Sequence, residues 1–531
     1  MSAQRDIVII GGGHNGLVTA CLLAKAGRKP LVLEKRDVAG GACVTEELGS
    51  GFRCPTLAHS AGPLMPGLAD ELGLVKHGLE PIRPEVRIFA PAPGGGPGIH
   101  IYEDAARTAS ELKKVSDKDS ARYPEFCATF AKLGKFLRPV LTMTPPSVDA
   151  PSTSEMWSML KLGRSFRALG KKDAYRLLRW GPMAVADLAS EWFETELLRA
   201  IVASRGICAS FAGPWSAGTT VPLLFQAAID GSAFAPAQTF RGGAGALTQA
   251  LAAAARAAGA EIRTGAAVAR INVDRDRVAS VTLDSGEEIA AKVVISNADP
   301  RTTFLKLIDP TSLEPDFLLK VRNYRAMGTM AKINYALSAL PTFVRGVEPK
   351  SLAGRIHIGP EVDYLERAFD AAKYGEPSTS PYLDITIPSI ADPSLTSGAT
   401  STHKGAHVMS VVMQFAPRNL KEGVWSAHRD DLAALVERTL ADYVPNFKSL
   451  IVERQVITPE DLESVYGLGG GHPLHGEASL DQIFTMRPIL GWARYRTPIA
   501  GLYLCGAGTH PGGGVTGGPG ANAAREIAKD L

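Results

Sequence analysis

A glycine-rich turn between a strand and a helix, near the start of the chain, constrains the fold more than any other feature. Residues 6–10 (Asp-Ile-Val-Ile-Ile) are rich in β-branched side chains and predict a buried strand. Gly11, Gly13 and Gly16 follow in the G-x-G-x-x-G spacing. We expect Gly11 to allow a tight turn, Gly13 to let the backbone approach a pyrophosphate, and Gly16 to let a helix pack closely on the strand.

The segment after this turn completes a dinucleotide-binding unit. Apolar residues recur at helical spacing over residues 17–24, and Gly27 provides a C-terminal stop. Residues 30–33 predict a second strand. Glu34 follows it, where a carboxylate can accept both hydroxyls of an adenosine ribose. The glycine spacing alone is weak, but strand, helix and acidic residue in this order predict a Rossmann-like domain.

Size and composition restrict the class of protein. A chain of 531 residues exceeds most single cores, so we expect two domains or one domain with large insertions. Hydrophobic residues make up 45% and charged residues 21%, as in ordinary globular proteins. The net charge of +3 gives no reason to expect nucleic acid as a partner. No apolar run approaches the roughly 20 residues of a membrane span.

The position of the first predicted strand bears on location. It begins about five residues from Met1, which leaves no room before it for a signal or transit peptide. We therefore expect a cytoplasmic protein, while import by an internal signal stays open.

The six cysteines are not spaced for disulfide redox chemistry. No two of them form a C-x-x-C pair, and no C-x4-C pair lies near the nucleotide motif. A flavin-linked disulfide reductase needs two nearby sulfurs, one to attack and one to resolve, so this subclass is not expected.

A glycine doublet, Gly40-Gly41, lies six residues beyond the predicted ribose-binding acid. With it, the run from Val8 to Gly41 resembles the FAD-binding start of the amine oxidase and carotenoid desaturase superfamily. In that superfamily the doublet lies against the ribityl and phosphate region of the flavin. The resemblance implies FAD as cofactor, with contacts from Gly11, Gly13, Asn15, Gly16, Glu34, Lys35, Gly40, Gly41 and Ala42.

The end of the chain carries a second resemblance. Residues 501–508 predict a strand ending in a glycine turn, followed by a glycine-dense loop and a helix over 521–531. Such a loop lets backbone N–H groups reach phosphate and flavin oxygens, and a helix N-terminus adds its positive dipole end. The run Gly-Ala-Gly-Thr-His-Pro-Gly closely resembles the C-terminal FAD motif of bacterial phytoene desaturases. It implies FAD contacts from Gly506, Gly508, Gly513 and Val515.

Between these motifs the chain returns to the cofactor. Residues 245–258 predict an alanine-rich helix, and three strands follow between residues 261 and 295. In the superfamily the residue matching Val268 touches the adenine side of FAD, and residues 293–300 look like the re-entry strand and its loop. The chain has one complete G-x-G-x-x-G, so no separate nicotinamide domain is expected.

The remaining segments predict a substrate domain. Residues 331–337, 382–388 and 408–415 predict strands, and residues 76–237 are more helical. Residues 156–172 interleave apolar and basic side chains. A helix of this kind can lie on an anionic membrane surface or cover a core with its charges in solvent, and both interpretations stay open. Two histidines at 472 and 475 have no companion ligand at metal-binding spacing, so no metal is expected.

Together these segments predict an α/β fold: a Rossmann-like FAD-binding domain of the amine oxidase and carotenoid desaturase type, with an inserted mixed α+β substrate domain. The FAD domain is expected to be discontinuous, over residues 1–75, 238–310 and 481–531. The substrate domain is expected over residues 76–237 and 311–480. The whole chain is similar to the phytoene dehydrogenase-like branch of the carotenoid and retinoid oxidoreductases. One departure is Arg53-Cys54-Pro55, where carotenoid desaturases have an aspartate and then a glycine.

The resemblance implies an FAD-dependent oxidoreductase in which flavin N5 accepts a hydride from a hydrophobic substrate. His59, Arg241 and His510 are the candidate catalytic side chains. Two alternatives stay open: an amine oxidase-like flavoenzyme, and an FAD-binding regulatory or interaction protein with little turnover. The expected partners are a small hydrophobic substrate and a peripheral membrane surface, while the oligomeric state is left open.

Overall fold

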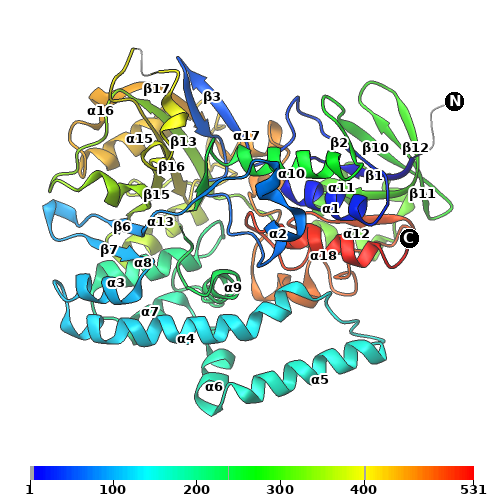
Figure 1. The fold of residues 1–531 in the computed structure, drawn as a ribbon, viewed down its shortest axis with the longest axis horizontal. Coiled ribbons are helices and arrows are strands. Elements are labelled where there is room, and N and C mark those ends of the chain that lie inside the picture. Colours follow the sequence, from blue (N-terminus) through cyan, green and yellow to red (C-terminus); the bar gives the residue numbers. More distant parts are fainter. Residues whose placement is uncertain (1–4, 237, 400–401) are drawn as a thin grey trace.

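Two seven-stranded sheets organise the molecule. A computed structural model describes residues 5–236, 238–399 and 402–531. Figure 1 shows the two sheets side by side, each with its own helices, and a layer of helices along one edge of the molecule. This arrangement confirms the predicted α/β class with a second, mixed α+β unit.

The first sheet has the order β10-β11-β12-β1-β2-β9, and β18 pairs with β12. Its central strand is the one predicted before the glycine turn, and Val8 pairs in parallel with Val294 on one side and Leu31 on the other. The sheet draws its strands from three distant parts of the chain. The strands are β1 (Arg5–Ile10), β2 (Pro30–Leu33), β9 (Glu261–Arg263), β10 (Val268–Asp274), β11 (Arg277–Leu283), β12 (Glu288–Ser296) and β18 (Leu502–Leu504).

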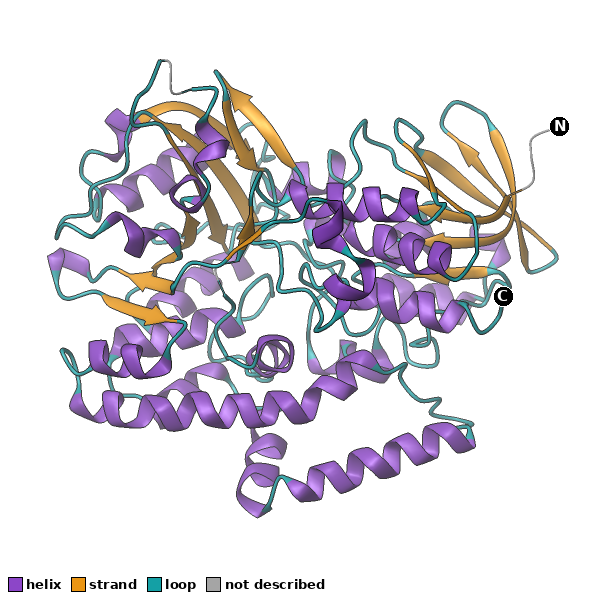
Figure 2. Ribbon diagram, viewed as in Figure 1, coloured by secondary structure: helices purple, strands orange, loops and turns teal. Residues whose placement is uncertain are grey.

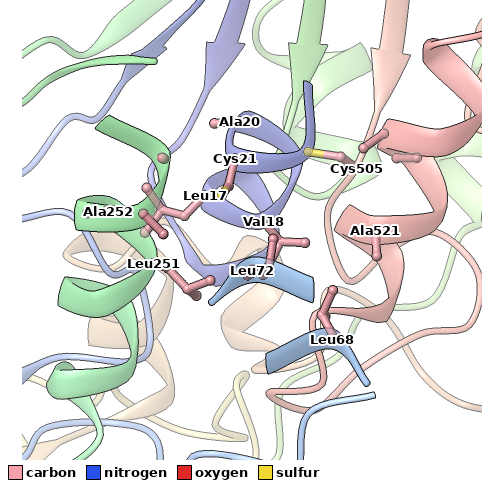
Figure 3. Close-up of a cluster of buried hydrophobic side chains, with 14 of the residues drawn as sticks. Leu17, Val18, Ala20, Cys21, Leu68, Leu72, Leu251, Ala252, Cys505 and Ala521 are labelled. Carbon is pink, nitrogen blue, oxygen red and sulfur yellow. The ribbon is translucent and has the colours of Figure 1, made fainter. Parts of the chain in front are cut away.

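Helix α1 (His14–Lys25) packs between α10 (Gly245–Ala257) and α18 (Gly518–Ile527). Figure 3 shows Leu17 and Cys21 of α1 among side chains of the flanking helices, all of them buried. The close fit of α1 and α18 requires glycine, because a Cβ on Gly520 would lie 2.3 Å from the carbonyl oxygen of Asn15. The first and last helices of the chain are thus joined beside the glycine turn. Two further helices, α11 (Pro300–Leu305) and α12 (Pro315–Asn323), follow β12.

The second sheet has the order β17-β13-β16-β15-β14-β6-β7 and is antiparallel except where β14 pairs with β6. Its central strands are apolar on one face and pack against α15 (Arg429–Ala441). The strands predicted at 331–337, 382–388 and 408–415 all occur. The strands are β6 (Val86–Ala90), β7 (Ile99–Tyr102), β13 (Met330–Leu337), β14 (Arg355–Ile358), β15 (Tyr382–Thr386), β16 (His407–Gln414) and β17 (Ile451–Ile457).

A helical layer lies beside the second sheet (Figure 2). Buried aromatic rings of Tyr123, Phe126, Trp180, Trp192 and Phe193 form its core. Its helices are α3 (Ala105–Leu112), α4 (Asp117–Thr142), α5 (Thr153–Ala168), α6 (Lys171–Trp180), α7 (Val185–Trp192), α8 (Glu196–Gly206), α9 (Val221–Asp230) and α13 (Val362–Lys373). The shorter helices elsewhere are α2 (Leu68–Leu72), α14 (Pro388–Ala391), α16 (Phe447–Leu450) and α17 (Pro459–Ser464).

Some boundaries differ from the sequence-based expectations. The loop expected over residues 42–75 contains a hairpin of β3 (Thr45–Gly49) and β4 (Phe52–Pro55), as well as α2. Its short strands carry charged residues, so hydrophobic periodicity does not reveal them. The short strands β5 (Pro81–Ile82) and β8 (Thr239–Phe240) also pair with each other. Among the described residues, no helix combines the length and the apolar character needed to cross a membrane.

The crossing of α4 and α9 yields a stability prediction. A Cβ on Gly134 would lie 2.1 Å from the carbonyl oxygen of Ala227, so Gly134→Ala forces the two helices apart. We expect the free energy of unfolding to fall by about 1–3 kcal/mol, as for overpacked cores. The matched control is Gly163→Ala in α5, where no atom lies within 4 Å. This control should be neutral or stabilising by up to about 1 kcal/mol. Thermal unfolding midpoints measure both, and equal midpoints would contradict the close crossing.

Candidate functional site

A cavity of about 640 Å³ connects the two sheets. Its wall includes Ile10 at the end of β1 and Leu33 at the end of β2, together with Lys332 on β13 and Val412 on β16. The C-terminal ends of parallel strands are where α/β proteins bind dinucleotides. One continuous space therefore joins a dinucleotide-binding edge to the second sheet.

Two glycine motifs form one side of the cavity from backbone alone. Gly11 has a φ of +93° and Gly41 a φ of +58°, both in the region that favours glycine. A Cβ on Gly41 would lie 3.0 Å from the Cα of Gly13, and Gly13 and Gly40 form a β-bridge. Gly13 is also the N-cap of α1 and supplies no side-chain cap, so N–H groups of the first turn stay available to an anion. This cradle suits a pyrophosphate.

Glu34 lines the same cavity. Its carboxylate is buried and accepts the backbone N–H groups of Gly12 at 2.8 Å and Arg36 at 3.0 Å. These two bonds fix the carboxylate, and its remaining lone pairs can accept ribose hydroxyls. Lys35 and Val268 also line the cavity.

The C-terminal loop closes another side of the cavity. Residues 511–516 line it, including Gly513 and Val515. A Cβ on Gly513 would lie 2.5 Å from the Cβ of Leu474, so only glycine fits there. The following helix, α18, begins after Gly517 without a side-chain cap. Asn15 and Ala42 also line the cavity.

Four of the predicted cofactor residues do not line the cavity. A Cβ on Gly16 would lie 2.2 Å from the carbonyl oxygen of Gly11, so Gly16 permits the close packing of helix on strand. Gly40 takes part in the bridge to Gly13. A Cβ on Gly506 or Gly508 would meet Asn297 or Pro300, respectively. These four glycines do not line the cavity themselves, but they allow the elements around it to pack closely.

The three predicted catalytic residues are not brought together. His59 lines the cavity, and its Nε2 lies 3.6 Å from Asp384 Oδ1. Arg241 has an exposed side chain (61%) paired with Glu80, outside the cavity. Arg241 is therefore not placed to reach a substrate in this cavity.

His510 is also misplaced as a catalytic candidate. It is buried outside the cavity wall, and its Nε2 donates to the carbonyl oxygen of Val140 at 2.8 Å. Burial lowers its pKa to about 4 and keeps it neutral at pH 7. Its role is to join α4 to the C-terminal loop.

Sequence reasoning missed a charged cluster at the second sheet. Val412 of β16 pairs with Lys332 on one side and with Asp384 on the other, so the three side chains share the face toward the cavity. Asp384 accepts hydrogen bonds from Arg355 at 2.8 Å and from Arg205 at 3.1 Å. Three otherwise apolar strands each carry a charged residue: Lys332 in β13, Arg355 in β14 and Asp384 in β15. This pattern is the signal that could have indicated the cluster.

Burial and charge set the protonation states of this cluster. Burial lowers the pKa of Lys332 to about 8 and that of His59 to about 4, so at pH 7 the lysine is charged and the imidazole neutral. Burial would raise the pKa of Asp384, but the guanidinium groups of Arg355 and Arg205 hold it well below its usual range. Asp384 is therefore an anion.

The histidines of the 469–476 loop have structural contacts. His472 Nδ1 accepts the N–H groups of Leu474 at 3.1 Å and Gly476 at 3.3 Å. Within residues 5–236, 238–399 and 402–531, no three His, Cys, Asp or Glu side chains gather as a metal site.

Comparison with known proteins agrees with this geometry. Residues 16–528 match the model of the family described as flavin containing amine oxidoreductase. The chain is 33% identical to pyridine nucleotide-disulfide oxidoreductase domain-containing protein 2 of Rattus norvegicus, over all of this chain and 94% of that protein. It is 27% identical to a limonene dehydrogenase polypeptide of Castellaniella defragrans, over 99% of this chain and 95% of that protein.

More distant relatives share the fold. Phytoene desaturase (lycopene-forming) of a Paracoccus species is 24% identical over 97% of this chain and 95% of that protein. A solved oxidoreductase from Methanosarcina mazei superposes with a TM-score of 0.62 at 17% identity, over 99% of this chain and all of that one. A putrescine oxidase variant superposes with a TM-score of 0.60 at 15% identity, over 99% of this chain and 98% of that one.

The family match spans nearly the whole chain and includes Gly41 of the cradle, Glu34 and the C-terminal loop. The chain therefore belongs to the flavin containing amine oxidoreductase family and is an FAD-dependent oxidoreductase.

Proposed function

We propose that this protein is a dehydrogenase that removes a hydride from a substrate with a large apolar body. The observation that carries the proposal is the single cavity, which continues from the glycine cradle to the second sheet and the helical layer. Cofactor and substrate can then occupy one space without a barrier between them. The relatives named for limonene dehydrogenation and phytoene desaturation, which align over almost the full chain, support this class of reaction.

The residues on the cavity wall fit FAD. Glu34 would hold the adenosine ribose, and Gly13 and Gly41 would lie against the pyrophosphate. The 511–516 loop and the start of α18 would lie at the flavin ring. When bound, FAD supplies a hydride acceptor at N5.

The side chains of the protein would orient the substrate and keep water out of the cavity. Apolar side chains from the helical layer and the loops around it face the cavity, among them Leu141, Phe225, Ile229 and Ile483. They would hold an apolar substrate and exclude water. At pH 7 Lys332 holds a proton at Nζ, and the neutral His59 can exchange hydrogen bonds with a polar substrate group.

Anaerobic reduction of the FAD-loaded protein tests this proposal. Limonene, a soluble polyene and hexylamine are added separately, and the flavin absorbance is followed. We expect an unsaturated hydrocarbon to bleach the oxidised flavin and hexylamine not to do so. Bleaching by the amine alone would favour the amine oxidase-like alternative. A flavin that dithionite reduces but no substrate bleaches would favour the regulatory alternative.

The position of Glu34 predicts a loss of FAD affinity on substitution. Glu34→Gln removes the charge that would strengthen the ribose hydrogen bonds, which contribute about 1.5–3 kcal/mol when charged. We expect the Kd for FAD to rise roughly 10- to 150-fold, measured by titrating the apoprotein. The control is Asp37→Asn, which removes an exposed carboxylate nearby that does not line the cavity. An unchanged Kd for Glu34→Gln would contradict the assignment of the adenosine end.

We also propose that α5 attaches the protein to an anionic membrane surface, from which an apolar substrate can be collected. None of its side chains is buried, and Met156 (54%) and Trp157 (64%) are exposed. Figure 1 shows α5 at the edge of the molecule, between the loop that follows α4 and helix α6. Exposed Lys161, Arg164 and Arg167 follow on the same helix. Basic and apolar side chains thus share the exposed surface of α5, where the apolar ones could enter a bilayer interface and the basic ones could attract anionic headgroups.

Vesicle co-sedimentation tests this surface. We expect binding to phosphatidylcholine vesicles that contain phosphatidylserine, weaker binding to phosphatidylcholine alone, and release at high salt. Trp157→Ala should reduce binding several-fold, because an indole anchors at the interface. The control is Tyr374→Ala, which removes an exposed aromatic ring outside α5. Equal binding by both variants would contradict attachment through α5.

A further inference from the structure

The cavity wall at the second sheet has more cations than anions. Arg205, Lys332 and Arg355 line the cavity, and each has a mostly buried side chain. Asp384 is the carboxylate that Arg205 and Arg355 share. His59 is neutral at pH 7, so the five groups carry a net charge of about +2. A buried charge without a counter-ion is costly, so this imbalance requires an explanation.

Arg87, a buried arginine away from the cavity, has its charge fully balanced by carboxylates. Arg87 forms ion pairs with Asp230 at 2.7 Å and with Glu103 at 2.8 Å, and it also donates to the carbonyl oxygen of Phe234. Arg87 thus has two carboxylates of its own. Arg205 and Arg355 share one carboxylate and lie on a cavity.

Several donors of the cluster have no acceptor among the described residues. Lys332 Nζ donates one hydrogen bond, to the carbonyl oxygen of Leu57 at 2.8 Å, and an ammonium has three donors. Arg355 Nε is buried without a partner. The neutral ring of His59 has one N–H donor, and neither ring nitrogen makes a hydrogen bond, although Nε2 lies 3.6 Å from Asp384 Oδ1. These groups are positioned to receive an oxyanion from the cavity.

The FAD phosphates would not supply that anion. The pyrophosphate cradle is built by Gly13 and Gly41 in the first unit, whereas Lys332 and Asp384 are on strands of the second sheet. The missing anion is therefore expected to belong to the molecule that occupies the substrate end.

We propose that Arg205, Lys332 and Arg355 form a binding site for a substrate carboxylate, so that the substrate is an apolar molecule with one acidic end. This proposal rests on the proposed function, because it places the carboxylate in the substrate part of the same cavity. The apolar wall holds the body of the molecule, and the cationic cluster fixes its end and therefore the position of the bond that is oxidised. Arginine and lysine donors suit a carboxylate in a dry site.

The titration of Lys332 gives the site a pH dependence. The charged or titratable groups around it are Cys54, Arg355, Asp384, Cys43 and His59, and burial lowers its pKa to about 8. A carboxylate ligand stays ionised from pH 6.5 to 9.5. Affinity for a carboxylate should therefore be greatest below pH 8 and should fall as the pH rises past it.

Matched eight-carbon ligands test the proposal on the FAD-loaded protein. Octanoate, 1-octanol and octylamine are titrated at pH 7, and binding is measured by calorimetry and by the change in flavin absorbance. We expect octanoate to bind at least about tenfold more tightly than octanol, as charged hydrogen bonds imply, and octylamine to bind most weakly. Octanoate affinity should fall above pH 8.

Variants assign this preference to the cluster. Lys332→Met should reduce the preference for octanoate to a few-fold and abolish its decline above pH 8. If Lys332→Met does not fold with FAD, Arg205→Gln provides the second test of the preference. The control is Arg107→Gln, which also removes one positive charge but from an exposed pair with Glu85 outside the cavity. Its octanoate affinity should equal that of the wild type.

Two results would overturn the proposal while leaving the proposed function intact: equal affinities for octanoate and octanol in protein that binds FAD, or a Lys332→Met variant with a changed flavin potential but full preference for octanoate. The second result would assign the cluster to the flavin. Failure to bind FAD at all would instead overturn the proposed function.

Discussion

The contact between the backbones of Gly13 and Gly41 is the constraint on which the cofactor half of the structure depends. A Cβ on Gly41 would lie only 3.0 Å from the Cα of Gly13, so the two motifs leave no room for a side chain between them. Their N–H groups and the uncapped first turn of α1 can then lie directly against phosphate. The other elements hold this contact in place, because α1 is packed between α10 and α18.

The second sheet contributes to the site through side chains, whereas the first contributes mainly through backbone. Its strands are apolar toward α15, but toward the cavity they place Lys332 and Asp384 on either side of Val412. One unit thus offers polar backbone to a cofactor, and the other offers charged side chains within an apolar wall. Because a single cavity runs between them, a substrate positioned by the second unit lies beside a cofactor held by the first.

The sequence was sufficient to predict the cofactor half because its signals are local. Strand, glycine turn, helix and Glu34 lie within thirty residues, and each has a fixed role in the motif. The central strands of the second sheet were also predicted, since apolar and polar residues alternate over 331–337 and the segments 382–388 and 408–415 read as further strands. The hairpin of β3 and β4 was missed, because charged residues hide its alternation.

The charged cluster could not be predicted, because its members come from distant segments. Arg205 ends α8, while Arg355 and Asp384 are on neighbouring antiparallel strands, and only strand register brings them together. The structure places Arg241 and His510 away from the cavity for a related reason. Both lie near glycine-rich turns in the sequence, but the side chain of Arg241 points to solvent and that of His510 bonds α4. Nearness to a motif in sequence does not give side-chain direction.

The absorbance spectrum of the purified protein, with the flavin released and quantified, tests the central claim most directly. The geometry of the cradle, Glu34 and the C-terminal loop predicts one FAD per chain, bound as purified or after reconstitution. A protein that retains no flavin after incubation with FAD would contradict the account.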